Sequence, residues 1–152
     1  DAAYPGAVDT AVLIKESAAK AGIKIDVVRE TADGYWSDVW MKKPWCFSFW
    51  GGRPSEDWMF TMGYAADAAW NEGHYKGKRF NELLDAARAE LDNKKRREMY
   101  VEMQTLMSNE GGSIIPMFAN ILMATSQKVG YENMAANFDL DGLRAHERWY
   151  FV

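Results

Sequence analysis

The sequence has few of the residues that build disulfides and metal sites, with one cysteine and two histidines among 152 residues. A single cysteine, Cys46, excludes an internal disulfide and a cysteine-based metal site, and its place in an aromatic run predicts a buried, unreactive thiol. His74 and His146 are far apart and lack the cysteine or carboxylate spacing typical of metal ligands, so we interpret them as solvated side chains. We therefore expect no metal site and no cofactor.

The sequence also has fewer basic than acidic residues, 18 against 22. The formal net charge is −4 and the isoelectric point is near 5.2. These values argue against a nucleic-acid partner, since the one basic run, Lys94 to Arg97, follows a helical pattern and is best interpreted as a solvated face. No apolar run approaches the length of a membrane span.

Aromatic residues, in contrast, are abundant, at 14% of the sequence with seven tryptophans. The 48% hydrophobic and 26% charged residues are typical of a globular chain that is long enough for one domain, or for one and a fraction. The aromatic content exceeds what a core of this size needs. Two explanations stay open, an exposed aromatic ligand-binding surface and burial against chain that lies outside this sequence.

The most informative stretch is WCFSFWGGRPSEDW, residues 45 to 58. Residues 45 to 50 alternate on two faces, which predicts a strand, and Gly51-Gly52-Arg53-Pro54 predicts a turn in which glycine permits positive φ. Ser55 then precedes two carboxylates and an apolar run, which predicts a helix N-terminus. Strand, glycine loop and helix form the arrangement in which α/β proteins present ligand-binding groups, so this loop is the first candidate site.

The rest of the chain predicts mainly helices. Apolar spacing predicts helices over 7–21, 35–41, 57–64, 80–91 and 93–109, an irregular stretch over 65–78, strands over 23–28 and 113–118, and a weakly periodic tail from 131. Gly22 is expected to end the first helix and Asp92 to cap the last one. A helix between two strands favours parallel pairing, so we expect an α/β sheet. The early first helix and the missing initial Met suggest a processed product or a fragment.

Three motifs resemble a known family. WGGRPSEDW, AWNEG and the long run from Phe80 to Phe118, which carries Asp92, Lys95 and Arg96 at a helix junction, resemble the C-terminal part of family 5 extracellular solute-binding proteins. These proteins are periplasmic receptors of ABC importers for peptides, nickel complexes and related solutes. The resemblance covers roughly residues 7 to 150.

The resemblance implies both a fold and a set of partners. The fold would be the C-terminal lobe of a type II periplasmic-binding-protein-like receptor, α/β, with a small and mostly parallel sheet flanked by helices. Residues 1–128 would form the ligand-binding lobe, and residues 129–152 a crossover tail that packs on a missing N-terminal lobe of the same receptor. The ligand, a small molecule or oligopeptide, would be captured between the lobes and delivered to an ABC permease, in a periplasmic or extracellular location.

Arg53 is the most informative candidate in the glycine loop. Peptide-binding relatives place near this position an aspartate that receives the peptide amino terminus, whereas a guanidinium suits a carboxylate or phosphate, so we expect an anionic group on the ligand. Arg53 could instead pair with Glu56 or Asp57 and fix the loop. The other expected ligand-binding residues are Trp50, Gly51, Gly52, Trp70, Asn71, Tyr35 and Trp36, and for the aromatic residues among them core packing is the alternative.

Two other functions stay open. The Gly-Gly-Arg loop could belong to an enzyme with an anionic substrate, but no catalytic triad, metal constellation or phosphate-binding fingerprint accompanies it, so we expect no enzyme. Exposed aromatic residues could instead mark a protein-interaction domain.

Overall fold

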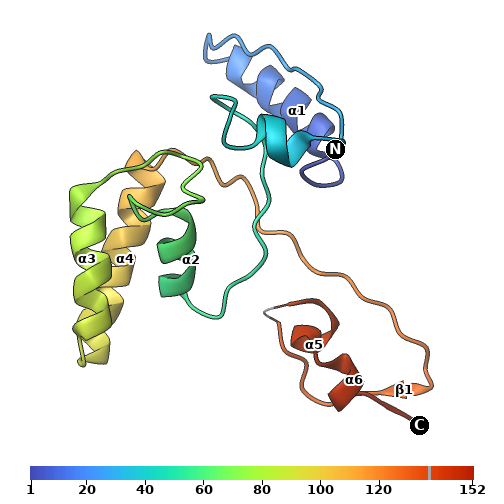
Figure 1. Cartoon of the computed structure of the whole chain (residues 1–152). Coiled ribbons are helices and arrows are strands. Elements are labelled where there is room, and N and C mark those ends of the chain that lie inside the picture. Colours follow the sequence, from blue (N-terminus) through green and yellow to red (C-terminus); the bar gives the residue numbers. More distant parts are fainter. Residues whose placement is uncertain (137) are drawn as a thin grey trace. The chain divides into compact units, whose positions relative to one another are not determined.

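A computed structural model describes residues 1–136 and 138–152 (Figure 1). The chain divides into two compact units, Asp1–Trp50 and Gly51–Val152. The boundary therefore falls between Trp50 and Gly51, at the point where the sequence predicts the change from strand to glycine loop.

The first unit begins with the predicted helix. Helix α1 spans Ala7–Ala19, and Gly22 follows it with φ of 77°. The amide of Ile23 donates to the carbonyl of Ala18 at 3.0 Å, so the chain reverses over the last turn of the helix. The prediction that a left-handed glycine ends this helix is confirmed, because glycine carries no Cβ penalty at positive φ.

A short helix and a small core complete the first unit. The π-helical turn η1 spans Tyr35–Val39 after Gly34, which has φ of 77°, so the predicted helix ends two residues earlier than expected. Tyr35 and Val39 are buried together with Ala3. Phe47 packs against this group, and its ring meets that of Tyr4 edge to face at 5.8 Å between centroids.

Three helices pack together in the second unit. Helix α2 spans Glu56–Gly63, α3 spans Lys78–Ala89 and α4 spans Asn93–Glu110. Both predicted caps are confirmed. The Ser55 side chain accepts a hydrogen bond from the Trp58 amide, and the Asp92 carboxylate accepts from the amides of Lys94 and Lys95.

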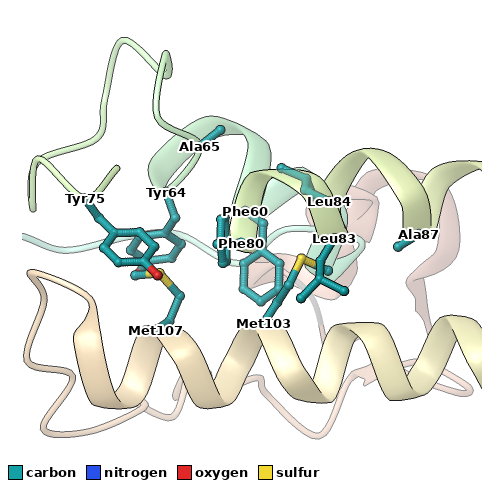
Figure 2. Close-up of a cluster of buried hydrophobic side chains, with 10 residues drawn as sticks. All are labelled: Phe60, Tyr64, Ala65, Tyr75, Phe80, Leu83, Leu84, Ala87, Met103 and Met107. Atoms are coloured by element: carbon teal, nitrogen blue, oxygen red, sulfur yellow. The ribbon is translucent and has the colours of Figure 1, made fainter. Parts of the chain in front are cut away.

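The core of these helices is aromatic and sulfur-rich, as Figure 2 shows. Phe80 and Met103 are fully buried, and the ring of Phe60 lies 5.3 Å from that of Phe80. The remaining buried members are Tyr64, Ala65, Tyr75, Leu83, Leu84, Ala87 and Met107. The inward face of α4 consists of Met103 and Met107, which are buried, and of Tyr100 and Leu106, which pack against the same core.

The C-terminal part holds a small local structure around a buried carboxylate. Strand β1, Val129–Gly130, pairs with β2, Tyr150–Phe151, in antiparallel register. Between them lie α5, Asp139–Leu143, and α6, Ala145–Arg148. Asp141 is 2% exposed and accepts from the Ala135 amide at 2.6 Å and the Trp149 indole at 3.3 Å, and its carboxylate pairs with Arg148 at 3.1 Å.

The predicted strands are not paired in the described part of the chain. Segments 23–28, 45–50 and 113–118 contain no strand, and among the described residues the pairing observed is that of β1 with β2. A β-branched or aromatic pattern predicts an extended backbone, but a ladder also needs a neighbouring strand at the right distance. The local strand predictions are therefore not met within these residues, and the α/β fold class stays a prediction.

Candidate functional site

The predicted ligand-binding residues fall in both units. Tyr35, Trp36 and Trp50 belong to the first unit, and Gly51, Gly52, Arg53, Trp70 and Asn71 to the second. The residues thus form two local arrangements.

In the first unit, Tyr35 is a core residue. Its hydroxyl donates to the carbonyl of Phe47 at 2.8 Å. The pKa of Tyr35 is raised, mainly because the side chain is buried and secondly because Cys46 is near. Trp36 is 45% exposed, and its ring packs edge to face with Tyr35 at 5.6 Å and with Trp40 at 5.9 Å. Trp50 is half-buried. Of these three side chains, Trp36 is the most exposed to a ligand, and the rings of Tyr35 and Trp40 pack against it.

A hollow lies beside this core. It has a volume of about 60 Å³ and is lined by α1 and the extended segment after it, with Val8, Val28 and Arg29 among its residues. Clefts that enclose a drug-sized ligand have volumes of roughly 300 to 1,000 Å³, far above this value. The hollow is therefore too small to enclose a whole solute.

In the second unit, Arg53 holds the glycine loop together. Its Nη1 donates to the carbonyls of Gly51 at 2.8 Å and Gly52 at 3.1 Å. Neither glycine has a positive φ, so the expected left-handed turn is not formed. The guanidinium thus contacts the backbone of its own loop, and a ligand contact by Arg53 stays a prediction.

The carboxylate considered as a partner of Arg53 contacts other groups. Asp57 Oδ1 accepts from Arg88 Nε at 2.9 Å and from the Tyr100 hydroxyl at 3.3 Å. Burial, followed by the Asp57 charge, raises the pKa of Tyr100. These contacts join the first turn of α2 to α3 and α4, so the helix that follows the glycine loop is fixed to the helical hairpin.

The loop from Tyr64 to Gly77 is organised by the side chain of Asn71. Asn71 is 5% exposed, its Nδ2 donates to the carbonyls of Ala65 at 3.2 Å and Tyr75 at 2.6 Å, and its Oδ1 accepts from the Tyr75 amide at 3.1 Å. An amide group that serves three backbone partners replaces the hydrogen bonds that a helix or strand would provide. We call the segment Tyr64–Gly77 the clamped loop.

A second asparagine joins the ends of the clamped loop. Asn81, in the first turns of α3, accepts from the Ala66 amide at 2.9 Å and donates to the Gly77 carbonyl at 2.7 Å. The middle of the loop lies against the end of α4, because a Cβ on Gly112 would lie 2.2 Å from the carbonyl oxygen of Gly73. Sequence reasoning missed Asn81, although an amide early in a helix after a long irregular segment was a usable signal.

The predicted pair Trp70 and Asn71 is therefore divided between two roles. Asn71 is buried and bonded within the loop, whereas Trp70, its neighbour in sequence, is 44% exposed. Of the two, Trp70 has the accessible side chain. Both loops of the second unit flank α2, the glycine loop before its first residue and the clamped loop after its last one.

Within residues 1–136 and 138–152, no three histidine, cysteine, aspartate or glutamate residues are placed to hold a metal ion. None of the helices in these ranges combines the length and apolar character of a membrane crossing. No protein-family model matches the chain, and no curated protein matches it significantly. The family resemblance therefore stays a prediction.

Proposed function

We propose that residues 1–152 form the C-terminal lobe of a family 5 solute-binding receptor, the subunit of an ABC importer that captures a small peptide-like or anionic solute and delivers it to the permease. The ligand binds between this lobe and a first lobe that lies outside these residues. The protein is a periplasmic or extracellular binding protein with no catalytic role of its own and no cofactor.

The placement of two loops around one rigid helix carries this proposal. Helix α2 has eight residues and is roughly 12 Å long, with the glycine loop at its first end and the clamped loop at its second. The contact between Asp57 and Arg88 fixes α2 to the hairpin. Loops on a rigid scaffold are common carriers of binding residues, and here they carry Arg53 and Trp70.

Exposed apolar segments support a covering lobe. Large apolar side chains that are exposed in several neighbouring stretches of the sequence are typical of a surface that another part of a protein covers. The most exposed side chains in the C-terminal part are Ile114 at 74%, Phe118 at 91%, Leu122 at 90%, Phe151 at 88% and Val152 at 74%. The tail 129–152 and the extended segment before it would pack on the first lobe. Strands outside these residues would pair with the extended segment.

The mechanism is closure of the two lobes around the ligand. A ligand that contacts both lobes stabilises the closed form over the open one by its difference in affinity for the two forms. The permease recognises the closed form, so transport depends on ligand. In this arrangement Arg53 receives the anionic group, and Trp70 of the same unit supplies aromatic surface.

The experiment is a binding titration of the two-lobed receptor with short peptides that have either a free or an amidated C-terminus. We expect the free acids to bind about 10- to 100-fold more tightly, because a hydrogen bond to a charged group contributes about 1.5 to 3 kcal/mol. Small-angle scattering should show closure with the free acid. Absence of both binding and closure would contradict the proposal.

Variants of Arg53 separate its two roles. Arg53→Gln keeps a donor for the carbonyls of Gly51 and Gly52 and removes the charge, so we expect it to abolish the preference for the free acid while the unfolding temperature stays unchanged. Arg53→Lys keeps the charge and should retain part of the preference. A preference that is unchanged in Arg53→Gln would assign Arg53 to loop structure alone.

A protein-interaction domain is the second candidate, and the same exposed apolar residues favour it. This function predicts that the chain associates with itself or with a protein partner when the first lobe is present as well as when it is absent. Light scattering of the chain with and without the first lobe distinguishes the two. Self-association that the first lobe abolishes agrees with the receptor, and association that persists agrees with the interaction domain.

A further inference from the structure

The clamped loop is unusual because it is long and ordered without containing a helix or strand. Irregular segments of more than about 12 residues are uncommon in compact domains, and those that are ordered are often functional. Its ends are close in space, since the Ala66 amide and the Gly77 carbonyl both bond the side chain of Asn81. A compact loop with joined ends and its own internal contacts has the properties of an Ω-loop.

The interior of the loop is satisfied, whereas Trp70 lies at its surface. Asn71 engages the backbone of Ala65 and Tyr75, and Tyr75 packs its ring edge to face on Phe80 at 5.7 Å. The Trp70 side chain is 44% exposed, whereas its sequence neighbour Asn71 is 5% exposed. An indole has only two side-chain torsions and a large apolar face, so a fixed tryptophan contributes contact area at a low entropic cost.

We propose that the ligand carries an apolar or aromatic side chain that packs on the Trp70 indole, and that Asn71 and Asn81 are the positioning residues that hold Trp70 in place. The inference rests on the proposed receptor function and specifies its ligand. Trp70 contacts the ligand directly. The two asparagines act through the loop and do not contact the ligand.

Arg53 lies before the first residue of α2 and Trp70 lies after its last one, so the two side chains belong to different loops. The apolar part of the ligand is therefore distinct from its anionic end. Tetrapeptides with a free C-terminus carry both parts and serve as probes.

The test compares tetra-alanine with four tetrapeptides that each contain one phenylalanine, by calorimetric titration of the two-lobed receptor. We expect one of the four to bind about 2- to 10-fold more tightly than tetra-alanine, the contribution of an aromatic pair. Trp70→Ala should remove this preference, so that the phenylalanine tetrapeptides and tetra-alanine bind this variant with equal affinity. Trp45→Ala is the matched control, since Trp45 is 59% exposed and belongs to the other unit, and should keep the preference.

Two further variants test the positioning residues. Asn71→Ala and Asn81→Ala should increase hydrogen exchange of the amides in 65–77 and abolish the phenylalanine preference, so that the phenylalanine tetrapeptides and tetra-alanine bind with equal affinity. Asn81 is only partly buried, so Asn81→Ala provides the test if Asn71→Ala does not fold. A preference that survives in these variants despite faster exchange would overturn the positioning role.

The outcomes separate this inference from the proposed function. If the wild type binds peptides and the phenylalanine preference persists in Trp70→Ala, the role of Trp70 is wrong and the receptor function stands. If the wild type binds none of the five peptides, the receptor function fails and this inference fails with it.

Discussion

Asn71 and Tyr75 are joined by two hydrogen bonds of opposite direction. The Asn71 Nδ2 donates to the Tyr75 carbonyl at 2.6 Å, and the Tyr75 amide donates to Asn71 Oδ1 at 3.1 Å. Both residues are buried, so water does not readily replace either bond. This exchange closes the turn inside the clamped loop and places the Tyr75 ring in the core with Phe80.

The first prediction concerns the loss of this side chain. Asn71→Ala leaves a buried amide of Tyr75 and a buried carbonyl of Ala65 without their partner, and each unsatisfied group costs about 1 to 3 kcal/mol. We expect the free energy of unfolding to fall by about 2 to 4 kcal/mol in urea titrations. Asn109→Ala, at an exposed position of α4, is the control and should change stability by less than about 0.5 kcal/mol.

The second prediction concerns the contact between Gly73 and Gly112. A Cβ on Gly112 would lie 2.2 Å from the Gly73 carbonyl oxygen, so Gly112→Ala must displace the backbone of the clamped loop or of the chain after α4. Overpacking of this kind costs about 1 to 3 kcal/mol. Gly51→Ala is the control, because its Cβ would meet only Arg53 Nη1, at 3.6 Å. Equal unfolding midpoints for the two variants would contradict the close approach.

The sequence predicted the helices well because their signals are local. Apolar spacing located α3 and α4, and Ser55, Asp92 and Gly22 marked helix ends through groups that act within a few residues of themselves. A cap needs only the amides of the next turn, and a left-handed glycine only its own backbone. Such signals are complete within the sequence window that contains them.

The strands and the loop geometry could not be predicted in the same way. A strand at 45–50 depends on a partner distant in sequence, and periodicity does not specify that partner. The Asp57 carboxylate contacts Arg88 and Tyr100, which lie 31 and 43 residues away. The role of Asn71 depends on a fold of the loop that its composition does not encode. Of the candidate site, the sequence predicted which loops to consider but not which of Trp70 and Asn71 is accessible.

The third prediction tests the junction of the helical hairpin. The Asp92 carboxylate accepts from the amides of Lys94 at 2.8 Å and Lys95 at 3.1 Å, and Asp92→Ala removes both bonds. We expect a loss of about 1 kcal/mol in the free energy of unfolding, the usual contribution of an N-cap. Asp92→Ser should restore most of it. Asp85→Ala, an exposed carboxylate within α3, is the control; a loss as large as that of Asp92→Ala would point to a general charge effect instead.

The fourth prediction concerns pH and the buried ring of Tyr64. Burial, followed by the charge of Glu72, raises the pKa of Tyr64 above its ordinary value of 10.0. Below about pH 10 the phenol is neutral in both the folded and unfolded states, so it causes no pH dependence. Above that value the unfolded chain releases a proton that the folded chain retains, so the free energy of unfolding falls as pH rises toward the raised pKa.

Urea titrations at intervals from pH 8 to 11 measure this decline. Tyr64→Phe lowers the slope above pH 10 because one proton no longer distinguishes the two states, while the decline from Tyr35, Tyr75 and Tyr100, whose pKa values burial also raises, is retained. A slope that Tyr64→Phe leaves unchanged would show that this ring is accessible to solvent, which would contradict its burial against Phe60.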